Sequence, residues 1–116
     1  MKTYVEEVTS DSILKELHYG ANLLRVLLTL YTGDELALRF EEVVGISSFS
    51  YLWGASVEGL AVTDESTFRE VIKKGLVGDS AADAQHRSYQ FLDGDDQIVL
   101  EVVAGKLMIG NTVHNS

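Results

Sequence analysis

The sequence predicts an α+β protein in which a mostly antiparallel β-sheet of about six strands packs against one α-helix. Three observations lead to this prediction: apolar residues alternate on both sides of two short Gly–Asp turns, one segment has helical spacing, and proline is absent from all 116 residues. Without proline, glycine and aspartate must mark the turns. The length fits a single domain, 1–116, with one ordinary core.

The best-marked hairpin is predicted between residues 23 and 40. In the segment 23–31, every second residue from Leu24 to Leu30 is apolar, which is the period of a β-strand. The segment 35–40 alternates in the same way. Between them lies TGDE, where Gly33 tolerates a positive φ angle. We therefore expect these two segments to pair as antiparallel neighbours.

Further strands are predicted on both sides of this hairpin. Near the carboxyl end, HRSYQFLD and QIVLEVVAG flank a turn around Gly94, and KLMIGN after Gly105 predicts one more strand of the same meander. Upstream, TYVEEV and SILKELHY each predict a strand, and YGAN at 19–22 predicts the turn between the second of these and the leucine-rich strand. Alternatively, ILKEL forms one helical turn.

One helix is predicted over 65–75. Phe68, Val71 and Ile72 recur at the i, i+3 and i+4 positions, so we expect them to lie on one face and to pack against the sheet. Gly75 is well placed to end the helix.

The charge balance narrows the class of partner. The chain carries 18 Asp and Glu against 9 Lys and Arg, which gives a formal net charge of -9. Nucleic acids and anionic membranes are bound through surplus Lys and Arg, so neither is an expected partner. The same charge would attract a basic protein.

Cysteine usage and hydropathy indicate a cytoplasmic location. The chain has no cysteine, so disulfides and thiolate chemistry are excluded. The amino-terminal residues lack the apolar region of a signal peptide. The longest strongly apolar run, LLRVLLTLY, has nine residues and contains Arg25, which is too short for a membrane span.

No catalytic residues, cofactor or metal site are expected from motifs. The serines show no Gly-x-Ser-x-Gly turn, which would expose a nucleophile. Asp93, Asp95 and Asp96 offer oxygen ligands, but the twelve-residue loop of a calcium site is missing and the spacing fits a hairpin turn equally well.

The stretch SFSYLWGASVEGLAV, residues 48–62, contains the candidate binding residues. If it is a strand, Phe49, Tyr51 and Trp53 line one face, and Glu58 adds a carboxylate nearby. One interpretation is that the rings belong to the core, as large aromatic residues usually do. The other is a recognition surface for a protein partner or a second copy of the chain, because aromatic side chains are common binding anchors.

Together these observations predict a small acidic, non-enzymatic binding protein that engages a protein partner through an acidic surface bearing aromatic side chains. An inhibitor or immunity-type protein for a basic enzyme is one concrete form of this hypothesis. One alternative is a small-molecule-binding module with an apolar pocket. Another is a small hydrolase or isomerase assembled from scattered residues such as His86, Asp93 and Tyr89.

Overall fold

The computed structural model describes residues 2–48, 54–75 and 86–110. They form one antiparallel sheet of eight strands and one helix, which confirms the predicted α+β class with a dominant sheet. In chain order the elements are β1 (Lys2–Tyr4), β2 (Ser12–Gly20), β3 (Leu23–Thr29), β4 (Glu35–Ser48), β5 (Ser56–Val57), β6 (Gly59–Thr63), α1 (Thr67–Gly75), β7 (Arg87–Leu92) and β8 (Ile98–Ile109).

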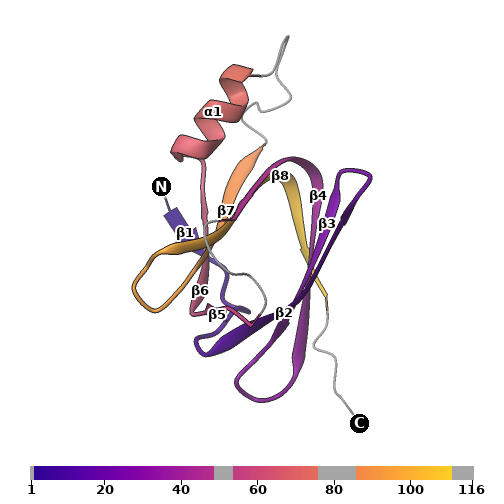
Figure 1. Cartoon of the computed structure of the whole chain (residues 1–116), viewed down its shortest axis with the longest axis vertical. Helices are drawn as coiled ribbons and strands as arrows, with labels where there is room; N and C mark the ends of the chain where they lie inside the picture. The colour runs from indigo at the N-terminus through magenta and orange to yellow at the C-terminus, as the bar shows by residue number, and fades with distance from the viewer. Residues whose placement is uncertain (1, 49–53, 76–85, 111–116) are drawn as a thin grey trace.

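The sheet is rolled so that its two ends approach each other. Its strand order is β1-β6-β7-β8-β4-β3-β2-β5, with every neighbouring pair antiparallel. Strands β5 and β6 lie near opposite ends of this order, yet only Glu58 separates them in the chain. The Glu58 N–H also donates to the carbonyl oxygen of Leu92 in β7 at 2.7 Å. Figure 1 shows this roll, with α1 at the top of the view.

The leucine-rich hairpin is confirmed. Strand β3 pairs with β4 in a register that runs from Leu24 opposite Phe40 to Thr29 opposite Glu35. Strand β4 is much longer than the predicted segment because it continues past a bulge between Val43 and Gly45. A bulge increases local twist and bend, so one continuous strand can follow the curve of the roll.

The other strands agree with the prediction in part. The β7–β8 hairpin is confirmed, but KLMIGN continues β8 to Ile109 and is not a separate strand. The segment SILKELHY lies within β2, so the alternative of a helical turn is wrong. Ala21 and Asn22 both have positive φ, at 54° and 61°, as a two-residue hairpin turn of the favoured twist requires. The strand predicted at TYVEEV ends at Tyr4 as part of β1. The sheet has eight strands rather than about six, because β5 and β6 form where the sequence left the stretch 48–62 open.

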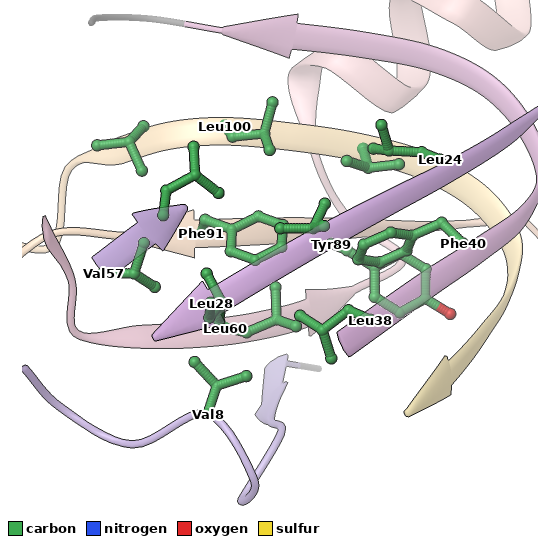
Figure 2. Packing of buried hydrophobic residues seen from close by; sticks show 14 of the residues in the cluster. Val8, Leu24, Leu28, Leu38, Phe40, Val57, Leu60, Tyr89, Phe91 and Leu100 are labelled. Carbon is green, nitrogen blue, oxygen red and sulfur yellow. The ribbon is translucent and has the colours of Figure 1, made fainter. Parts of the chain in front are cut away.

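The core fills the inside of the roll. Phe40 of β4 and Phe91 of β7 are fully buried, and their ring centroids are 6.0 Å apart in an edge-to-face arrangement. Tyr89 packs on Phe40 in the same way at 5.1 Å. Figure 2 shows these rings among aliphatic side chains from β3, β4, β5, β6, β8 and the segment before β2: Val8, Leu24, Leu28, Leu38, Val57, Leu60 and Leu100.

Helix α1 begins at Thr67, two residues later than predicted. The Ser66 side chain is the reason, because its Oγ accepts a hydrogen bond from the backbone N–H of Arg69 at 2.9 Å and so caps the first turn. The helix ends at Gly75, where the sequence indicated.

The face by which α1 contacts the sheet is narrower than predicted. Phe68 and Ile72 lie over Gly45 of β4, where an added Cβ would overlap Ile72 and lie 3.2 Å from the Phe68 ring. Val71 is 61% exposed, so the prediction that it faces the sheet is wrong. Adjacent helical residues are about 100° apart, and a stripe through Phe68 and Ile72 therefore leaves Val71 at its side.

Candidate functional site

The outer face of β7 and β8 carries polar side chains that are buried. Side chains alternate along β7, so Tyr89 and Phe91 face the core while Ser88 and Gln90 face outward. Nevertheless Ser88 is completely buried and Gln90 is only 6% exposed. Glu101 of β8 lies opposite Gln90 in the register and is 2% exposed. These three residues form a buried polar cluster.

Hydrogen bonds within this cluster leave one acceptor unused. The Ser88 hydroxyl donates to the Glu101 carboxyl group, and Gln90 Nε2 donates to the same Glu101 oxygen at 3.4 Å. This bond sets the orientation of the Gln90 amide, because only its NH₂ group can donate to the Glu101 oxygen. Gln90 Oε1 is therefore turned away, buried and without a hydrogen-bond partner among the described residues. A buried acceptor in this state is uncommon in native proteins.

A cleft of about 480 Å³ lies between this cluster and the amino-terminal end of α1. Most of its lining groups are hydrogen-bond acceptors or hydroxyls, with two apolar side chains. The lining residues are Ser47, Glu65, Ser66, Thr67, Phe68, Gln90, Ile98 and Glu101. We call this depression the acidic cleft.

The rim of the acidic cleft is negatively charged. Asp64, Glu65 and Glu70 are exposed, and they line a shallower hollow that adjoins the cleft. Arg69 is buried, and its guanidinium donates to the backbone oxygens of His86 at 2.7 Å and Asp64 at 3.2 Å and to Glu70 Oε2 at 3.3 Å. The three carboxylates outweigh this one cation and the roughly +0.5 charge of the helix end. The rim therefore attracts cations.

The buried hydroxyl group of Ser88 is not placed to act as a nucleophile. Ser88 is the hydroxyl beside the buried carboxyl group of Glu101, but none of its surface is exposed. A nucleophile must come within contact distance of its substrate, so Ser88 cannot serve as one in this arrangement. What the cleft offers is a set of acceptors for a ligand that brings N–H donors.

Three of the four binding residues predicted from the sequence, Phe49, Tyr51 and Trp53, lie outside the described residues. Glu58 is described, and it does not line the acidic cleft. Each of its carboxylate oxygens is 3.2 Å from the backbone nitrogen of Asp11, and one of them accepts from the Ser56 hydroxyl at 3.0 Å. Glu58 thus ties the loop before β2 to the short link between β5 and β6.

The residues of the hydrolase alternative are not brought together. Tyr89 faces the core, where burial raises the pKa of its hydroxyl group. His86 comes just before β7, and its backbone oxygen accepts from Arg69. Asp93 lies beyond the other end of β7, and its Oδ1 accepts from the backbone nitrogens of Asp95 and Gln97 at 2.8 and 2.9 Å.

The aspartates of this turn have a structural role in the hairpin. Asp96 adopts a positive φ of 58°, which a reversal between β7 and β8 requires. Within residues 2–48, 54–75 and 86–110, no group of three or more His, Asp or Glu side chains is arranged to hold a metal ion.

The sequence contains a signal of the buried polar cluster. Glu101 is a single acidic residue inside the apolar run QIVLEVVAG, and Ser88 and Gln90 alternate with aromatic residues in HRSYQFL. Such a pattern normally describes a strand with one face in water. Here α1 packs on β4 and β7 and helps to cover the outer face, which the pattern alone does not reveal.

Comparison with known proteins gives no further guidance, because no protein-family model, curated protein or solved structure matches this chain. Among the described residues, the one helix, α1, is not long and apolar enough to traverse a lipid bilayer.

Proposed function

We propose that this chain is a small acidic, non-enzymatic binding protein that engages a protein partner through the acidic cleft. One observation carries the proposal: Gln90, whose Oε1 is buried and has no hydrogen-bond partner among the described residues, lines a cleft whose rim is negatively charged. A ligand that brings both N–H donors and positive charge would satisfy the acceptor and offset the rim. An arginine side chain does both, with five N–H donors in a fixed planar arrangement.

The local charge near the cleft and the net charge of the chain both indicate a basic partner. Near the cleft, the carboxylates of Glu65 and Glu70 favour a cationic side chain. The net charge of -9 over the whole chain increases the rate of encounter with a basic protein and repels nucleic acid. An inhibitor or immunity-type protein that occupies a basic enzyme is the concrete form we favour. The cysteine-free composition suits a reducing compartment, and we place this activity in the cytoplasm.

The aromatic part of the proposed binding surface is inferred from the sequence alone. Phe49, Tyr51 and Trp53 would add apolar anchors to an interface that charge alone holds weakly. The same anchors suit a second copy of the chain. Sedimentation velocity of Trp53→Ala separates the two cases, because only self-association through this residue would be reduced in the absence of any partner.

The cleft is tested with a defined arginine ligand. The blocked peptide acetyl-Gly-Arg-Gly-amide is titrated into ¹⁵N-labelled protein, beside the same peptide with citrulline, which keeps the shape of arginine and removes its charge. We expect the arginine peptide to shift backbone amide signals of Glu65, Ser66 and Gln90. It should bind about tenfold more tightly than the citrulline peptide, since hydrogen bonds to charged groups are worth about 1.5–3 kcal/mol.

Two variants assign this binding to the cleft. Glu65→Gln should weaken arginine binding several-fold, and Gln90→Leu should weaken it while keeping the side-chain volume. Glu6→Gln removes the same charge at an exposed position outside the cleft and serves as the matched control. Equal affinity for the two peptides, or an equal loss in Glu6→Gln and Glu65→Gln, would contradict the proposal.

A further inference from the structure

A second charged feature lies on the outer face of β2, β3, β4 and β8, away from the acidic cleft. Four residues on neighbouring strands form a row across the sheet: His18 lies opposite Arg25, Arg25 opposite Arg39, and Arg39 opposite Met108. Directly opposed residues of antiparallel strands lie on the same face of a sheet. The adjacent residues Leu24 and Phe40 point into the core, so this row lies on the outside.

The two arginines of this row are an unfavourable pair in isolation. Like charges directly opposite each other on antiparallel strands repel, and this chain has only nine Lys and Arg to distribute. Among the described residues, Arg39 pairs with one carboxylate, because its Nη2 lies 2.8 Å from Glu41 Oε2.

Arg25 forms no ion pair with any described residue. Glu16 is the carboxylate beside it, but a Glu16 oxygen is 3.0 Å from His18 Nε2. That hydrogen bond is the main cause that lowers the pKa of Glu16, while attraction to Arg25 contributes less. The guanidinium of Arg25 is exposed and remains available to an external anion.

The surface around the two guanidinium groups is concave and apolar. A depression of about 400 Å³ contains Arg25 and Arg39, with Leu23, Ala37 and Met108 among its other lining residues. This volume is within the range of small-molecule sites. Arg39 Nη2 lies 3.3 Å from Met108 Sδ, a contact that holds the guanidinium against the apolar floor.

We propose that this depression binds a small organic carboxylate with an apolar body, such as a medium-chain fatty acid. The carboxylate would lie between Arg25 and Arg39, where guanidinium groups donate paired hydrogen bonds, and would relieve their mutual repulsion. The apolar chain would cover Leu23, Ala37 and Met108. This site is independent of the acidic cleft, and neither depends on the other.

The probe for this site is octanoate, titrated into ¹⁵N-labelled protein below its micelle concentration. Acetate tests the apolar contribution, and octyltrimethylammonium carries the same chain with the opposite charge. We expect octanoate to shift the amide signals of Leu23, Arg39 and Met108 and to bind about tenfold more tightly than acetate. Octyltrimethylammonium should leave these signals unchanged.

Variants then identify the anion-binding groups. Arg25→Gln and Arg39→Gln should each weaken octanoate binding about tenfold, while circular dichroism confirms that both variants fold. Arg87→Gln removes an exposed arginine at the start of β7 and should bind octanoate like the parent protein. The proposal is overturned if octanoate does not bind, if octyltrimethylammonium shifts the same signals, or if Arg87→Gln loses as much affinity as Arg25→Gln.

Discussion

The two faces of strand β7 are both buried, but their chemistry is opposite. The inner face presents Tyr89 and Phe91 to a core of rings and aliphatic side chains, where no specific partner is needed for stability. The outer face presents Ser88 and Gln90 to Glu101, where each polar atom needs a partner and Gln90 Oε1 has none among the described residues. The inner face is built for stability. The outer face leaves a hydrogen bond unmade, which is uncommon in native proteins.

The largest expected effect tests the inner face. Phe40 contacts both Tyr89 and Phe91 edge-to-face and is completely buried. Phe40→Ala should lower the free energy of unfolding by about 3–5 kcal/mol, from lost transfer energy and from the cavity that remains. Urea denaturation followed by circular dichroism measures this loss.

Tyr31→Ala is the matched control for that measurement. Tyr31 lies in the turn between β3 and β4 and is 70% exposed, so its removal should change stability by less than about 0.5 kcal/mol. Similar losses in Phe40→Ala and Tyr31→Ala would mean that the interior of the roll is not the main source of stability.

The inner face is also the part that the sequence predicts well. The alternation from Leu24 to Leu30 and from Leu36 to Phe40 is local, and both the strands and their pairing follow from it. The approach of the two sheet ends near Glu58 does not follow from the sequence, because it depends on which distant strands lie beside β5 and β6. Short strands contain too few residues to show an alternating pattern. The position of a helix over one face of the sheet produces no pattern in the sequence of that face.

For the same reason, the candidate site was only partly accessible to sequence reasoning. Acidic charge is visible in the composition, but the acidic cleft requires Glu65 from the loop before α1 and Glu101 from β8 to line the same depression. Val71 shows the limit on a smaller scale. Its spacing fits an apolar stripe, yet Gly45 admits only the narrow contact of Phe68 and Ile72.

A smaller effect tests the outer face. Ser88→Ala removes one of the two donors to the buried Glu101 carboxyl group and should lower the free energy of unfolding by about 1–3 kcal/mol. Ser10→Ala, at an exposed position before β2, should have almost no effect. If Ser88→Ala is as stable as Ser10→Ala, the buried polar cluster does not need this hydrogen bond, and the contrast between the two faces weakens.

The smallest effect appears only at high pH and concerns Tyr89. Burial raises the pKa of its hydroxyl group above the ordinary value of about 10, against a weaker opposite effect of Arg87. The unfolded chain releases this proton first as pH rises. The stabilising contribution of neutral Tyr89 is therefore complete below about pH 10 and is lost as pH rises through the pKa of the folded state.

Tyr89→Phe isolates this contribution, because it keeps the ring that packs 5.1 Å from Phe40 and removes the titrating group. We expect the free energy of unfolding to fall less between about pH 8 and pH 11 in Tyr89→Phe than in the parent protein. An identical pH dependence in Tyr89→Phe and the parent protein would show that ionised Tyr89 reaches water without unfolding, and that the inner face does not exclude charge as its apolar packing implies.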